Sequence, residues 1–173
     1  YFMGFWTLYV VWSWIPTVFV DAGYTRSQGI DALTGFNLGA MPGILIRAFL
    51  TTRLPLVPLL SFFFLSAGGV LVCVGLTEPS ELGSLMALMF VSGVFLHGGF
   101  TCLYALAAQV YPSEVRAAGV GWAAGLGRTG AIVSPVFAAA LITAGWDMYA
   151  LFVCFALPLL AVGFLLWVFS NDD

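Results

Sequence analysis

The feature that most constrains the fold is a set of six continuous apolar stretches separated by short polar gaps. A bilayer core about 30 Å thick is crossed by a helix of about 20 apolar residues. The stretches lack the apolar/polar alternation of a membrane β-strand, so they predict helices. No gap is long enough for a soluble domain, and we expect one all-α transmembrane domain over 1–173. The expected spans are 2–20, 30–50, 54–76, 82–110, 115–144 and 149–169.

The composition excludes most soluble classes of protein. Apolar residues make up 62% of the chain and charged residues 8%, whereas soluble domains carry about 25% charged residues. Five arginines, no lysine and a net charge of -3 leave no basic surface for nucleic acid. The three cysteines and the single histidine have no metal-ligand spacing. No catalytic pair converges within the spans, so we expect no enzyme activity, no metal and no cofactor.

The arginines predict the orientation in the membrane. Arg47, Arg53 and Arg116 fall at the connections on one side, whereas Arg26 lies on the opposite side among acidic residues. Because arginine is enriched in cytoplasmic loops, both termini are expected in the cytoplasm, with the bacterial inner (plasma) membrane as the location. Arg47 lies near the end of its span, where we expect its side chain to snorkel to the interface.

Arg128 is the arginine that falls well inside a predicted span. At 1.5 Å per residue it lies about 21 Å from Glu114, beyond the midplane. A charge there costs at least about 2.5–3.5 kcal/mol and requires a partner or a use. It shares a helix face with small residues that favour close helix contact; these are Ala117, Gly121, Gly125 and Thr129. Two interpretations stay open: Arg128 contacts a translocated anion, or it pairs with protein groups and holds helices together.

His97 is the titratable side chain expected near the middle of the fourth span. It shares a helix face with Thr101 and Tyr104. The tight turn after this span predicts an antiparallel hairpin, in which His97 and Arg128 lie at nearly one depth. The pair Gly98–Gly99 is expected to weaken the helix, as in transporter sites with broken helices. Proton coupling, a hydrogen bond between helices and simple lining of a cavity are all compatible with this pattern.

Polar residues in the first two spans are further candidates. Tyr9, Ser13 and Thr17 recur at every fourth position and form a polar ridge on an apolar helix. Asn37 lies in the middle of the second span. Such residues either connect helices by hydrogen bonds or contact a ligand.

The sequence around the fourth connection resembles a known family. It reads Tyr-Pro-x-x-x-Arg-Ala-x-Gly-x-Gly from Tyr111, followed by Gly-Arg-x-Gly-Ala-Ile-x-x-Pro from Gly127. This pattern resembles the junction of helices ten and eleven in the major facilitator superfamily. The similarity is greatest to the aromatic acid:proton symporters, which include the 4-hydroxybenzoate transporters. It extends over the whole chain, as helices seven to twelve.

This resemblance implies half of a twelve-helix transporter, with the N-terminal half missing from the chain. The implied activity is proton-coupled transport of a small organic anion, an aromatic carboxylate, by alternating access across the lipid bilayer. Arg116 and Arg128 match the two arginines of the family motif. The loop that ends at Arg53 has Thr52 where the family carries aspartate, so a gating contact is in doubt there.

The predicted site therefore has three parts. Candidate substrate-binding residues are Tyr9, Ser13, Asn37, Thr101, Tyr104 and Arg128; the proton-coupling candidate is His97; and the cytoplasmic gating candidates are Arg53, Glu114 and Arg116. Alternative interpretations are a truncated fragment or membrane interaction module that transports nothing, and a transporter of sugars or other metabolites.

Overall fold

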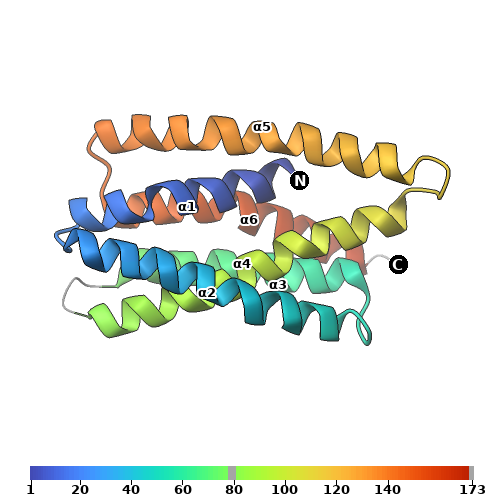
Figure 1. Ribbon diagram of the computed structural model, residues 1–173, viewed down its shortest axis with the longest axis horizontal. Coiled ribbons are helices and arrows are strands. Elements are labelled where there is room, and N and C mark those ends of the chain that lie inside the picture. Colours follow the sequence, from blue (N-terminus) through green and yellow to red (C-terminus); the bar gives the residue numbers. More distant parts are fainter. Residues whose placement is uncertain (78–80, 172–173) are drawn as a thin grey trace.

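The computed structural model describes residues 1–77 and 81–171, and within these residues it contains six α-helices and no strand. All six are long and apolar enough to cross a membrane, so the predicted all-α membrane fold is confirmed. The helices lie side by side, with the connections at the two ends of the bundle (Figure 1). They are α1 (Phe2–Asp21), α2 (Arg26–Leu50), α3 (Leu56–Leu76), α4 (Leu82–Val110), α5 (Arg116–Thr143) and α6 (Met148–Asn171).

The first connection shows why α2 begins four residues before its expected start. Thr25 caps the helix: its hydroxyl accepts a 3.3 Å hydrogen bond from the Gln28 amide, and the Gln28 side chain accepts one of 2.8 Å from the Thr25 amide. This reciprocal pair satisfies two amides that a helix end leaves free. Gly23, with φ of 94°, makes the tight reversal from α1. Polar capping therefore extends the helix beyond its apolar stretch.

The closest backbone approach is between α2 and α4. A Cβ atom on Gly39 would lie 2.9 Å from the Val94 amide nitrogen, and one on Gly93 would lie 3.1 Å from the Phe36 Cα. In lipid, helices associate through packing, and glycine allows two backbones to touch. Together with the α3–α6 pair, this contact is the most extensive in the bundle.

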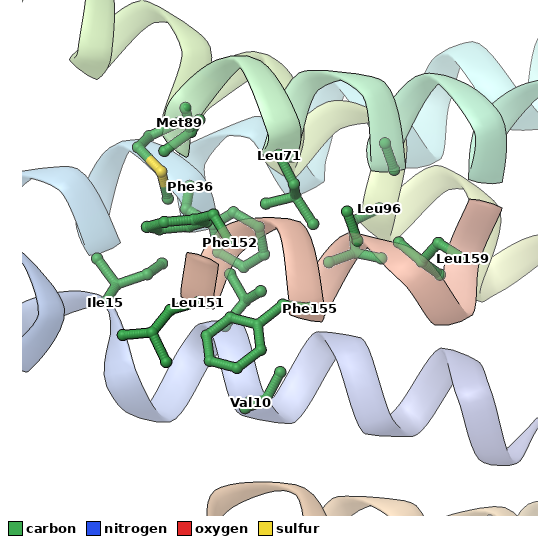
Figure 2. Close-up of a cluster of buried hydrophobic side chains, with 14 of the residues drawn as sticks. Val10, Ile15, Phe36, Leu71, Met89, Leu96, Leu151, Phe152, Phe155 and Leu159 are labelled. Atoms are coloured by element: carbon green, nitrogen blue, oxygen red, sulfur yellow. The ribbon is translucent and has the colours of Figure 1, made fainter. Parts of the chain in front are cut away.

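The buried core is built mainly by five of the six helices. Figure 2 shows part of it, where α1, α2, α3, α4 and α6 meet. Among the described residues, α5 supplies to the fully buried cluster only Ala138. The labelled side chains are each at most 2% exposed; they are Val10, Ile15, Phe36, Leu71, Met89, Leu96, Leu151, Phe152, Phe155 and Leu159.

Helices α4 and α5 are antiparallel, as expected, but they do not pack closely against each other. Although α4 and α5 are consecutive, they contact each other little, and α5 lies along one edge of the bundle against α1 (Figure 1). A Cβ on Gly127 would lie 2.9 Å from the Phe5 ring, and one on Gly130 would lie 3.2 Å from the Trp6 amide nitrogen. The indole of Trp14 also donates a 3.0 Å hydrogen bond to the Pro135 carbonyl.

The predicted packing stripe on α5 is also wrong for this bundle. A Cβ on Gly121 or Gly125 would meet no atom within 4 Å, so this face is open. The small residues that contact α1 lie on another face of the same helix. The glycine pair of α4 behaves differently from its prediction as well, because α4 continues unbroken through it. A Cβ on Gly99 would lie 2.7 Å from the Phe64 ring, so the pair makes room for α3.

Candidate functional site

A cavity of about 190 Å³ lies between α1, α2 and α4 and is the candidate site. Its lining is Leu8, Tyr9, Trp12, Asn37 and His97. The three polar side chains Tyr9, Asn37 and His97 each lie near the middle of a different helix. The structure therefore brings together three residues that the sequence proposed separately. Concave sites with a few convergent polar groups are typical of small-molecule binding.

One ring nitrogen of His97 is bonded to the backbone of its own helix. Its Nδ1 lies 2.9 Å from the Gly93 carbonyl oxygen, and its ring centroid lies 5.0 Å from that of Phe36. A carbonyl only accepts hydrogen bonds, so Nδ1 carries the proton in this contact. In the neutral ring, Nε2 then remains an acceptor. The hydrogen bond lies within α4, so it orients the ring and does not connect helices.

Asn37 is oriented in the same way on α2. Its Nδ2 donates a 2.8 Å hydrogen bond to the Leu33 carbonyl of its own helix. The side-chain oxygen and the second amide hydrogen are left for a ligand, because one of the four hydrogen bonds of the amide group is used here. Of the two roles proposed for Asn37, this contact fits cavity lining better than a bond between helices.

Aromatic rings form one wall of the cavity and extend it along α1 and α4. The Tyr9 and Trp12 rings meet edge to face at 5.9 Å, and the Tyr9 ring lies 6.0 Å from that of Phe5. Phe5 in turn contacts Phe100 of α4 at 4.8 Å, and Phe100 contacts Tyr104 at 5.8 Å. Tyr104 is therefore the last ring of this aromatic series and does not itself line the cavity. Such a surface suits the faces of a planar ring.

Two other predicted ligand contacts are not in the cavity. The Thr101 hydroxyl lies 3.0 Å from both the His97 and the Gly98 carbonyl oxygens, so it bonds to its own helix. Ser13 is exposed on α1 and is not among the lining residues. The buried hydroxyl of α1 is that of Thr7, which donates a 3.2 Å hydrogen bond to the Phe155 carbonyl of α6. Of the polar ridge on α1, Tyr9 therefore lines the cavity, whereas Ser13 lies on the surface.

Arg128 is exposed and does not line the cavity. Its residue follows Gly127, which contacts α1, and successive residues differ by about 100° around a helix. Arg128 thus lies beside the α1 contact, on the side that also carries Gly121 and Gly125. Within the described residues it has no ion-pair partner. Next to it, a groove of about 320 Å³ runs along α5 and is lined by Ala118, Gly121, Trp122, Gly125 and Leu126.

Arg47 has surroundings that the sequence interpretation did not predict. We expected its side chain to reach the interface; in the bundle it is partly buried, and its Nε atom is sealed from solvent with no hydrogen-bond partner among the described residues. It lies one turn beyond Gly43, and Gly39 and Gly43 both face α4. That four-residue series was visible in the sequence and could have placed Arg47 on the α4 side.

The gating candidates occupy exposed connections at one end of the bundle (Figure 1). Arg116 donates from Nε to the Tyr111 carbonyl at 3.3 Å, and the Arg53 guanidinium lies 5.1 Å from the Phe49 ring centroid. The Glu114 carboxylate accepts a 2.8 Å hydrogen bond from the Ser113 hydroxyl. Its own backbone amide, and then this hydroxyl, lower the pKa of Glu114 from its usual 4.5.

Metal chemistry finds no support in the part of the chain that the structure describes. Residues 1–77 and 81–171 contain no group of three or more metal-ligating side chains. Cys73, Cys102 and Cys154 are free thiols, and Cys102 is buried. The cavity is lined by aliphatic, aromatic, amide and imidazole groups.

Comparison with known proteins gives a consistent result. The sequence profile described as Major Facilitator Superfamily matches residues 1–173. The 4-hydroxybenzoate transporter PcaK of Pseudomonas aeruginosa is 30% identical over 158 residues, which cover 91% of this chain and 35% of the relative. The 3-(3-hydroxy-phenyl)propionate transporter of Escherichia coli is 29% identical over 171 residues, covering 99% and 42%. The gallate transporter of Pseudomonas putida is 30% identical over 162 residues, covering 93% and 36%.

These relatives are all longer than the region that matches. The chain spans less than half the length of each of the three, from 35% to 42%. The similarity therefore concerns one part of each transporter.

Proposed function

The chain belongs to the major facilitator superfamily, and from this premise we propose that it is the part of a secondary transporter that binds a small aromatic carboxylate and couples its passage to protons. Relatives named as transporters of aromatic acids support this substrate class. The observation that carries the proposal is the cavity in which Tyr9, Trp12, Asn37 and His97 meet near the middle of three helices.

The chemistry of this cavity fits an aromatic acid. The aromatic surfaces of Tyr9 and Trp12 stack on the substrate ring. The free amide groups of Asn37 and the Nε2 atom of His97 bond to its polar substituents. His97 is also the proton carrier in this proposal, because an imidazole changes charge near physiological pH.

A second bundle of helices completes the site. In transporters of this kind, two bundles rock about a midplane site and expose it alternately to each side. We assign the open face of α5 to the contact with that bundle, because Gly121 and Gly125 have no neighbour within 4 Å there. Arg128 on this face then supplies positive charge between the bundles, where an intramembrane charge has a use. With both termini in the cytoplasm of a bacterium, Arg53 and Arg116 lie on the inner side.

A membrane interaction module that transports nothing is the second candidate. It is favoured by the same open groove along α5, which would equally accept a helix of another membrane protein. Thr52, in place of the expected aspartate, also weakens the prediction of a gating contact at Arg53.

An uptake assay tests the proposal. Cells that express the full open reading frame encoding this chain are given labelled 4-hydroxybenzoate, gallate, glucose or succinate, with and without a proton uncoupler. We expect uptake of the two aromatic acids, loss of uptake with the uncoupler, and no uptake of glucose or succinate. Correct membrane insertion without uptake of any of the four would contradict transport and favour the interaction module.

A matched pair of variants on α2 connects the assay to the cavity. Asn37→Ala removes an amide that lines it, whereas Thr34→Ala removes a hydroxyl that bonds only to the Ile30 carbonyl, at 2.9 Å. We expect slower uptake in the first variant alone. Equal uptake in both variants would contradict binding of the substrate in this cavity.

A further inference from the structure

Arg47 carries a positive charge in the last turn of α2. Its side chain is partly buried, and no group among residues 1–77 and 81–171 accepts a hydrogen bond from its sealed Nε atom. A sealed donor atom without a partner is costly, and a charged side chain within a membrane span is a candidate functional residue. The question is which anion reaches this position.

The packing of α2 on α4 gives the level of Arg47. Gly39 lies against Val94, and a Cβ on Gly98 would lie 3.1 Å from the Gly43 carbonyl oxygen. The contacts advance in the same direction along both helices, so Arg47, one turn after Gly43, lies one turn beyond Gly98. Cys102 is the residue one turn beyond Gly98 on α4, so Arg47 and Cys102 lie at the same level.

No acidic residue that the structure describes lies at this level. Those that the structure describes are at or near the helix ends: Asp21, Asp31, Glu81, Glu114 and Asp147. Asp31 precedes Arg47 by sixteen residues of the same helix, or about 24 Å along its axis. The counter-ion therefore does not come from a carboxylate of the described residues.

We propose that Arg47 binds the carboxylate of the transported aromatic acid, an inference that rests on the proposed function. Cys102, which marks the level of Arg47, lies five residues beyond His97 on α4, about 7.5 Å along the helix axis. One substituted benzoate spans this distance. Its ring occupies the cavity beside Tyr9 and Trp12, and its carboxylate points to the end of the bundle where α2 terminates.

The guanidinium is suited to this role. It binds a carboxylate through two parallel hydrogen bonds, and this geometry gives specificity as well as affinity. Arg47 thus selects acids inside the bundle, whereas Arg128 acts on the open face of α5. The two arginines have different neighbours, so their contributions are separable by experiment.

The test compares an acid with its neutral amide. Binding of 4-hydroxybenzoate and 4-hydroxybenzamide is measured on the purified product of the full open reading frame, as wild type and as Arg47→Gln, Arg47→Lys and Arg26→Gln. The last variant is the matched control, because Arg26 is an exposed arginine at the other end of α2.

We expect wild type to prefer the acid. Arg47→Gln should weaken binding of the acid by about tenfold to a hundredfold, the usual range for a charged hydrogen bond, and leave the amide unaffected. Arg47→Lys should recover part of the loss, since lysine keeps the charge without the two-pronged geometry. Arg26→Gln should behave as wild type. Unchanged preference for the acid in a folded Arg47→Gln protein would overturn the inference.

A second measurement uses wild type alone and does not depend on the folding of a variant. Phenylglyoxal modifies arginine, and mass spectrometry of the labelled peptides reports each site. The acid should protect Arg47, the amide should not, and Arg26 should react equally in every sample. Equal labelling of Arg47 with and without the bound acid would overturn the inference and leave transport standing. Failure of wild type to bind the acid at all would overturn the proposed function as well.

Discussion

Helices α4 and α5 are neighbours in sequence, have similar lengths and are both rich in glycine, yet their glycines have opposite surroundings. In α4, Gly93 and Gly99 are buried and lie against α2 and α3. In α5, Gly121 and Gly125 meet nothing within 4 Å. Small residues thus allow close packing on both helices, but the six-helix bundle uses only the surface of α4 and part of the surface of α5.

This difference separates two functions of small residues in a membrane helix. The glycines of α4 let α2 and α3 pack closely against it. The open glycines of α5 contribute nothing to the bundle and lie beside Arg128. In the proposed transporter, this open face and its charge contact the second bundle.

The largest expected effect comes from filling a glycine of α4. Gly93→Leu places a side chain where a Cβ would already lie 3.1 Å from the Phe36 Cα, so the α2 and α4 backbones must separate. We expect a loss of about 3 kcal/mol in the free energy of unfolding, the upper end for overpacking. Denaturation in detergent micelles measures it. The control Gly125→Leu should change the stability of the 1–173 bundle by less than about 0.5 kcal/mol. Equal losses in the two variants would contradict the difference in packing between the glycines of α4 and those of α5.

The next effect concerns transport through the open face of α5. Arg128→Gln should reduce uptake of 4-hydroxybenzoate by about tenfold or more, because a charge-assisted contact is lost. Membrane abundance should remain at the wild-type level, since Arg128 is exposed in the bundle. Initial uptake rates and immunoblots of membranes measure the two quantities. Uptake at the wild-type rate in this variant would exclude a role for the Arg128 charge in transport.

A smaller effect is expected on the α4 side of the comparison. His97→Gln removes the titratable ring from the cavity but keeps a side chain that donates hydrogen bonds, as Nδ1 does to Gly93. The pH dependence of uptake should flatten while transport persists. Ser92→Ala, which removes a hydroxyl bonded to the Met89 carbonyl on the same helix, is the control. A pH profile identical to wild type would exclude His97 as the proton carrier.

The smallest effect lies in the connection between the two helices. Ser113→Ala removes one of the two hydrogen bonds that lower the pKa of Glu114, so this pKa should rise toward 4.5 while the backbone contact keeps part of the shift. A depressed carboxyl pKa adds stability above the unfolded pKa, and this is lost as pH falls through the folded value. Carboxyl NMR of labelled protein in detergent follows it; an unaltered titration would exclude the Ser113 contact.

The site was predicted residue by residue but not as an arrangement. Tyr9, Asn37 and His97 stood out because each is a polar group in the middle of an apolar helix, and such groups have few roles in lipid. Trp12 was not among the candidate residues, although it lines the cavity. For Arg47, the sequence interpretation considered only the distance from the end of the helix. The side of α2 on which Arg47 lies follows from Gly43 and Gly39, one and two turns earlier, which face α4.

The amino-acid sequence is sufficient to predict six membrane helices, because the length of an apolar stretch and the need to satisfy every backbone group in lipid are local requirements. It also carried the family motif from Tyr111 to Pro135. The pairs of helices that contact each other could be identified only from the folded bundle. Small residues lie on more than one face of α5, and only the competition of all six surfaces for partners leaves Gly121 and Gly125 open while α1, α2 and α4 enclose a cavity.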